Sequence, residues 1–136
     1  MSIAYWLMQM SIDAIRPAAI AIEGAVERTA LTRSRTPSEM LGSSFKDRGS
    51  LFKLLSMSEL ELKAGIIAAS AGNHAQGVAY HAQRLGALAA IVMPEFTPYT
   101  KVEGVKRFGA EAILQGQSLK EAGIKARRLE QERRLT

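Results

Sequence analysis

The stretch from Ile66 to Gly77, IIAASAGNHAQG, decides the fold that this sequence predicts. A compact apolar run at 66–69 leads into a polar turn, and the turn leads into the helix-like segment 78–85. This order predicts a strand, a tight turn and the start of a helix. Because the first N–H groups of a helix have no partner within it, such a turn suits an anion, for example a carboxylate or a phosphate.

Short apolar runs and helical periods continue to alternate along the rest of the chain. We expect strands at 66–69, 88–93 and 112–114 and helices near 74–85, 98–108 and 118–134. Strands separated by helices pair in parallel through right-handed crossovers, which predicts an α/β protein: a three-layer arrangement with a parallel sheet and flanking helices. In such sheets ligands bind at the carboxyl ends of the strands, where the turn 70–74 lies.

The first 57 residues follow a different pattern. Apolar residues at spacings of three and four predict an amphipathic helix over about 11–26, interrupted by Pro17, and a second helix over 45–57. We therefore expect two parts. Residues 1–57 hold N-terminal helices, and residues 58–136 form a small α/β domain.

Composition restricts the class of protein. The chain has 136 residues, 47% of them hydrophobic and 23% charged, which suits about one domain with a buried core. It has no cysteine, which excludes disulfide bonds and thiolate metal sites. Much of the net charge of +5 lies in the last 20 residues. There, opposite charges four residues apart, such as Arg128 and Glu132, indicate a solvated helix face and not a nucleic-acid interface.

The N-terminus raises the question of a membrane or secretion signal. No apolar run reaches the ~18 residues of a membrane span, and the first residues lack the basic region of a signal peptide. We therefore expect a cytoplasmic protein with neither a membrane nor a nucleic acid as partner.

Two sets of residues are candidates for chemistry. A lysine can form a Schiff base with an aldehyde cofactor, and an apolar or cationic environment makes it more nucleophilic. Phe45 and Arg48 supply one such neighbour each to Lys46, although an isolated lysine of this kind is more often a solvated helix residue. Asn73, taken alone, is more often a helix cap. His81 has no partner at metal-ligand spacing, so we expect a packing or surface role for it and no metal site.

The segments Ser44-Phe45-Lys46-Asp47-Arg48-Gly49 and 70–77 together resemble motifs of the pyridoxal-phosphate (PLP) enzymes of the tryptophan-synthase-β fold type. The resemblance is closest to the threonine dehydratases (threonine ammonia-lyases) and runs from about residue 15 to 128. It implies that Lys46 binds PLP covalently, that Phe45 lies beside the cofactor and that Asn73 contacts the ring oxygen of PLP. It also implies that the substrate carboxylate is held by Ser70, Ala71, Gly72, Asn73 and His74.

The fold implied by this resemblance is the small domain of a fold-type II PLP enzyme, with residues 1–57 as part of the large domain. The implied reaction is α,β-elimination of L-threonine or L-serine to a 2-oxo acid and ammonia. An amino-acid substrate and a homo-oligomer are the implied partners. Ala71 stands where serine racemases tend to carry a serine that acts as an acid/base, which favours elimination over racemisation.

Two departures from the family pattern affect the predicted activity. The strand and loop that normally precede the lysine motif are absent after Gly42, and the chain stops before the glycine-rich phosphate-binding loop. The resemblance therefore predicts a truncated form that is weakly active or inactive. The alternatives are a non-catalytic α/β interaction module, or another fold-type II enzyme such as a threonine synthase or a serine racemase.

Overall fold

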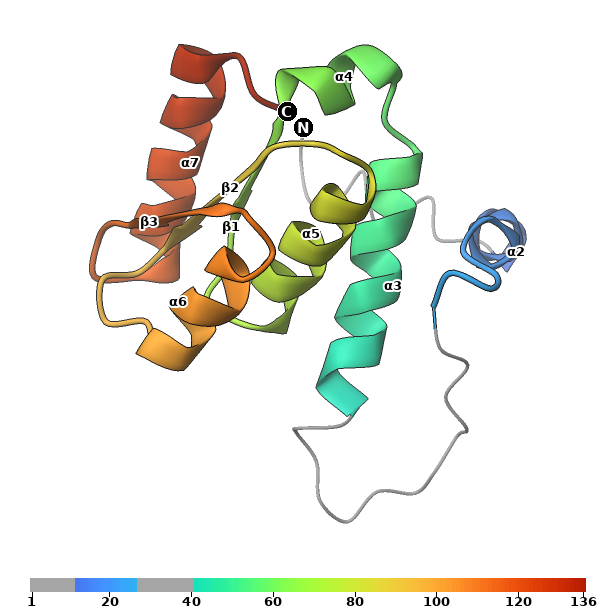
Figure 1. Ribbon diagram of the computed structural model, residues 1–136, viewed down its shortest axis with the longest axis horizontal. Helices are drawn as coiled ribbons and strands as arrows, with labels where there is room; N and C mark the ends of the chain where they lie inside the picture. Colours follow the sequence, from blue (N-terminus) through green and yellow to red (C-terminus); the bar gives the residue numbers. More distant parts are fainter. Residues whose placement is uncertain (1–11, 27–40) are drawn as a thin grey trace.

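The computed structural model describes residues 12–26 and 41–136, without the side chains of residues 12–14 and 41–45. From β1 onward its strands and helices alternate, as the sequence predicts (Figure 1). In chain order the elements are α2 (Ile12–Ala21), α3 (Leu41–Leu55), α4 (Glu59–Ala64), β1 (Ile66–Ala69), α5 (Asn73–Arg84), β2 (Ala89–Met93), α6 (Tyr99–Lys106), β3 (Glu111–Leu114) and α7 (Leu119–Arg133).

The sheet has three parallel strands in the order β1-β2-β3, which makes β2 the central strand. Ile66 of β1 pairs with Ala89 of β2. Every residue of β2 is buried, and burial on both faces accounts for its unbroken apolar run. The predicted strands 66–69, 88–93 and 112–114 are confirmed, with the start of β2 and of β3 each displaced by one residue.

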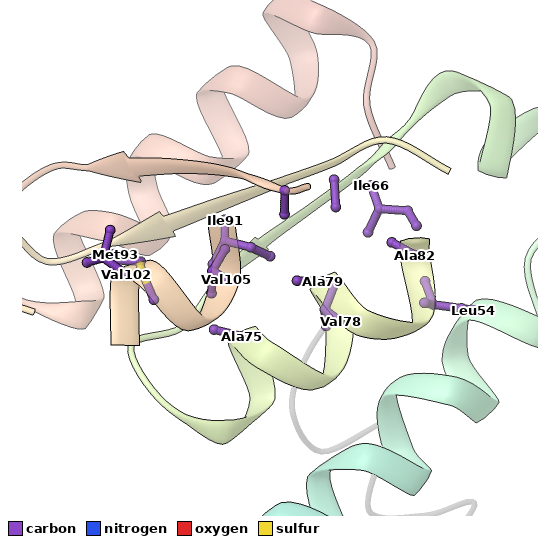
Figure 2. Packing of buried hydrophobic residues seen from close by; sticks show 12 residues of the cluster. Leu54, Ile66, Ala75, Val78, Ala79, Ala82, Ile91, Met93, Val102 and Val105 are labelled. Carbon is purple, nitrogen blue, oxygen red and sulfur yellow. The ribbon is translucent and has the colours of Figure 1, made fainter. Parts of the chain in front are cut away.

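Successive side chains of β2 point to opposite faces of the sheet. Ile91 and Met93 pack with α5 and α6, whereas Val92 packs against α7 on the other face. Figure 2 shows the first of these clusters, in which Ile91 and Met93 lie near Ala75, Val78, Ala79, Val102 and Val105. Helices thus cover both faces of the sheet, and the predicted α/β architecture with three layers is confirmed.

Helix α3 lies outside these layers and packs mainly on α5 (Figure 1). Leu51 and Leu54 of α3 are buried, and Leu54 belongs to the same apolar cluster as Ile91. The helix that carries Lys46 is therefore attached to the sheet through α5. Its position depends on how these two helices cross.

Some boundaries and one helix differ from the prediction. Helix α3 begins at Leu41, four residues earlier than expected, and α2 ends at Ala21, before a turn in which Gly24 has a φ of +75°. Helix α4 has no predicted counterpart, although its start carries a recognisable signal. The Glu61 N–H donates to Ser58 Oγ at 3.3 Å, and the Ser58 N–H donates to Glu61 Oε2 at 2.7 Å, which is a capping box.

The C-terminal helix has the solvated face that its charge pattern predicts. Arg128 Nε lies 2.6 Å from Glu132 Oε1, and both side chains are exposed. Among the helices of residues 12–26 and 41–136, we find none with the length and apolar character that a membrane span requires.

Candidate functional site

The first residue of the turn after β1 is still hydrogen-bonded to the neighbouring strand of the sheet. The Ser70 N–H donates to the Val92 carbonyl at 3.1 Å, and the Ser70 side chain is nearly buried. Its Oγ accepts from the Gly72 N–H at 3.4 Å. The turn therefore stays close to the carboxyl end of β1, where the sequence predicts a ligand site.

Helix α5 begins at Asn73 with an open first turn. Gly72 precedes it without a capping side chain, and its carbonyl accepts from the N–H groups of Ala75 at 3.0 Å and Gln76 at 3.4 Å. The first turn carries no acidic residue. The positive end of the helix dipole and the amides at the start of α5 are thus available to an anion.

Helix α3 brings Lys46 to this turn through a buried serine. Ser50 Oγ donates to the Lys46 carbonyl at 2.7 Å and lies 3.3 Å from His74 Nδ1. The single hydroxyl proton is used in the bond to the carbonyl, so the contact with the ring requires that His74 Nδ1 carries the proton and donates to Ser50 Oγ. In the neutral imidazole His74 Nε2 then has no proton.

The environment of His74 favours that neutral ring. Burial and the positive charge of Lys46 both lower the pKa of the His74 imidazole below its usual value. A neutral His74 adds no second positive charge beside the Lys46 amine. Among the described residues, no group of three or more histidine, cysteine, aspartate or glutamate side chains is placed to hold a metal ion.

Residues from four elements, α3, β1, α5 and α7, and from the turn after β1 line one cavity of about 490 Å³ at the carboxyl end of β1. Its lining consists of Lys46, Ala69, Ser70, Gly72, Asn73, His74 and Leu119. The predicted lysine, 24 or more residues away in sequence, thus shares a cavity with four of the five residues predicted to hold a carboxylate. Ala71 is not among the lining residues, and the side chain of Phe45 lies outside the described residues.

Leu119 is a lining residue that sequence reasoning missed. It is the first residue of α7 and is exposed. Nothing local distinguishes it from any other leucine at the start of an amphipathic helix. Its place at the cavity follows only from the packing of α7 on the sheet.

Two glycines of the turn and helix are explained differently. No atom lies within 4 Å of the place where a Cβ on Gly72 would stand, so the protein's own packing does not require a glycine there. A Cβ on Gly77 would lie 2.9 Å from Ser50 Oγ and 3.5 Å from the Lys46 carbonyl oxygen. Gly77 therefore permits the close approach of α3 to α5, and Gly72 leaves space beside the cavity.

Comparison with known proteins places this arrangement in a family. The model of the family described as "Pyridoxal-phosphate dependent enzyme" matches residues 35–136. An L-threonine ammonia-lyase from Thermotoga maritima is 39% identical over 135 residues, which cover 90% of this chain and 34% of that protein. A biosynthetic L-threonine dehydratase from Haemophilus influenzae is 50% identical over 94 residues, covering 69% of this chain and 18% of that protein.

A solved structure shows the same fold over much of the chain. The processed form of threonine deaminase isoform 2 from Solanum lycopersicum superimposes with a TM-score of 0.64 at 43% identity. The match covers 68% of this chain and 25% of that one. The chain thus spans less than half the length of each of these relatives.

Proposed function

The chain belongs to the pyridoxal-phosphate dependent enzyme family, and from this membership we propose that its cavity is the PLP-binding part of a threonine-dehydratase-type lyase. The observation that carries the proposal is the shared cavity of Lys46 and the turn 70–74. The names of the relatives, which are threonine enzymes, support L-threonine as the substrate in preference to L-serine.

The residues around the cavity fit the functional groups of PLP. Lys46 offers the primary amine that a covalent link to the aldehyde requires. Asn73 lines the same cavity with an amide side chain that can donate to the ring oxygen. The start of α5 offers amides and a positive dipole end to a carboxylate or a phosphate.

In this proposal each group of the chain has a separate task. PLP, when bound, supplies the electron sink that stabilises negative charge at the α-carbon of the amino acid. The amides at Gly72 to His74 bind the substrate carboxylate and orient its α-hydrogen. Lys46 Nζ takes the α-proton, and the β-hydroxyl leaves as water. Water then hydrolyses the resulting enamine to a 2-oxo acid and ammonia.

Ala71 and the neutral His74 refine the proposed chemistry. Ala71 has no hydroxyl, so it cannot serve as the second acid/base that racemisation needs, and elimination is favoured. A neutral His74 adds no charge of its own beside the Lys46 amine. The absence of a hydroxyl at position 71 is the feature that favours a lyase over a racemase.

Assembly, domain division and location belong to the same proposal. We assign residues 1–57 to a larger domain and residues 58–136 to a small α/β domain. A cytoplasmic homo-oligomer acting on a free amino acid is the form that the resemblance favours. Since the chain spans 34% of one relative and 18% of another, we propose weak turnover or none for this chain by itself.

The proposal is tested by adding PLP to the purified chain and recording the absorbance of the covalent lysine adduct. We expect an absorbance band that disappears in Lys46→Ala. The matched control is Lys53→Ala, which removes another exposed lysine from α3, two turns away and outside the cavity. A band that persists in Lys46→Ala, or that disappears equally in Lys53→Ala, would contradict the proposal.

A further inference from the structure

Both histidines of the chain lie on α5 and face α3. His74 and His81 are seven residues apart, which places them on the same side of the helix. His74 contacts Ser50, and His81 contacts Asp47, the residue directly after Lys46. Two polar contacts therefore connect α5 to the part of α3 that carries the lysine.

The contact between His81 and Asp47 is buried on the histidine side. The His81 side chain is fully buried, and its Nε2 lies 2.8 Å from Asp47 Oδ1. A carboxylate oxygen only accepts, so His81 Nε2 carries the proton and donates. Within the described part of the chain, His81 Nδ1 is buried and has no hydrogen-bond partner.

A buried imidazole at position 81 lowers stability unless its hydrogen bond to Asp47 is favourable. A buried polar atom without a partner loses the hydrogen bonds that it would make in water. A leucine or phenylalanine would fill the same apolar space, beside the ring of Tyr80 at 4.9 Å, without that loss. Of the contacts described for His81, the bond to Asp47 is the one that requires a side chain with an N–H donor.

Helices α3 and α5 cross closely, so the bond between Asp47 and His81 also affects the orientation of α3. Gly77 lies between the two histidines and lets α3 approach, because a Cβ there would lie only 2.9 Å from Ser50 Oγ of α3. Consecutive residues of a helix are rotated by about 100° about its axis. A bond that holds Asp47 against α5 therefore also determines the direction in which Lys46 points.

We propose that Asp47 and His81 form a positioning pair that sets the rotation of α3 and directs Lys46 into the cavity. This inference rests on the proposed function, since it assigns the pair a role in presenting the lysine to PLP. His81 is not among the residues that line the cavity, so in this proposal it acts through Asp47. The pair matters because a displacement of about 1 Å in a reacting group can cost ~100-fold in rate.

The test measures where PLP attaches, not whether the chain turns over substrate. The chain is incubated with PLP, reduced with borohydride and digested, and mass spectrometry gives the ratio of label on Lys46 to label on Lys53. Wild type is expected to label Lys46 preferentially. His81→Phe and Asp47→Ala are expected to lower that ratio by about tenfold or more, because either change removes a buried hydrogen bond to a charged group.

Rescue and control variants separate positioning from general damage. His81→Gln places an amide nitrogen where the imidazole Nε2 was, so it should restore the ratio. Gln83→Ala changes an exposed residue of the same helix and should leave the ratio unchanged. Circular dichroism shows whether each variant folds. If His81→Phe is unfolded, Asp47→Ala supplies the comparison, since the Asp47 side chain is partly exposed.

The outcomes distinguish this inference from the proposed function. A folded His81→Phe or Asp47→Ala variant with the wild-type ratio would overturn the positioning role and leave the proposed function intact. Failure of His81→Gln to restore the ratio would also overturn it. Equal labelling of Lys46 and Lys53 in the wild-type chain would instead overturn the proposed function.

Discussion

Ser50 Oγ lies 3.3 Å from His74 Nδ1, so a buried hydroxyl joins the helix of the lysine motif to the turn of the second motif. The same oxygen donates to the Lys46 carbonyl at 2.7 Å. The two motifs are separate in sequence, and this contact is where they meet.

Ser50→Ala should destabilise the protein by about 1 kcal/mol, because it removes one buried hydrogen bond and leaves a half-buried imidazole nitrogen without its acceptor. The measurement is the free energy of unfolding in urea. Ser56→Ala is the matched control, since Ser56 Oγ donates to the Lys53 carbonyl at the same distance of 2.7 Å but is exposed. Equal losses in both variants would show that burial at Ser50 contributes nothing.

Gly77→Ala should destabilise the protein by about 1–3 kcal/mol, although alanine is the better helix former. The added Cβ would lie 2.9 Å from Ser50 Oγ, a buried atom that already has two partners. Thermal or urea unfolding measures the change. Gly123→Ala in α7, where no atom lies within 4 Å of the new Cβ, should instead stabilise by roughly 0.5–1 kcal/mol. A stabilising Gly77→Ala would refute the close helix crossing.

Stability should fall as the pH drops below about 6.5, the ordinary value for histidine. Burial and Lys46 lower the pKa of His74 in the folded state, so the unfolded chain takes up a proton first. The stabilisation that comes from the neutral His74 ring is therefore complete above the pKa that His74 has in the unfolded chain. It is lost as the pH falls through the lower pKa that His74 has in the folded protein. The free energy of unfolding in urea, measured between about pH 5 and 7, should fall more in wild type than in His74→Asn. The asparagine retains a hydrogen-bond donor but does not titrate in this range.

Carboxylate, sulfate or phosphate should shift the amide resonances of Gly72 to Ala75 before those of other residues. The first turn of α5 has no acidic side chain, so an added anion meets no competing carboxylate from that turn. The start of α7 is the internal control. There the Glu121 carboxylate already accepts from the Gln117 N–H at 2.9 Å, so smaller shifts are expected. Equal shifts at both helix starts would indicate unspecific binding.

The chain with saturating PLP and L-threonine should release no more 2-oxobutanoate than its Lys46→Ala variant. The proposed reaction requires Lys46, Asn73 and the cofactor phosphate to be held together, and the chain covers only 34% and 18% of the length of its relatives from Thermotoga maritima and Haemophilus influenzae. The assay requires a preparation free of host dehydratase. Turnover clearly above the variant would show that the chain, or an assembly of it, completes the site.

Local sequence by itself determined the sheet and the turn. The apolar run of β2 was recognisable because a strand buried on both faces needs consecutive apolar residues, whichever helices cover it. The shorter runs of β1 and β3, which form the edges of the sheet and are only partly buried, were recognisable because helical segments alternate with them. The turn 70–74 was recognisable because a strand end and a helix start lie next to each other in the chain. Helix α4 is equally local, because the Ser58–Glu61 capping box that begins it is a sequence signal independent of hydrophobic periodicity.

Only the tertiary structure decided which residues meet at the site. The partnerships of Ser50 with His74 and of Asp47 with His81 join residues 24 and 34 positions apart. Leu119 comes to the cavity from α7 in the same way. Hydrophobic periodicity does not predict which residues so far apart in sequence will meet, since their contacts depend on the rotation and crossing of packed helices. A glycine at position 77 permits the crossing, but only the surrounding core sets its geometry.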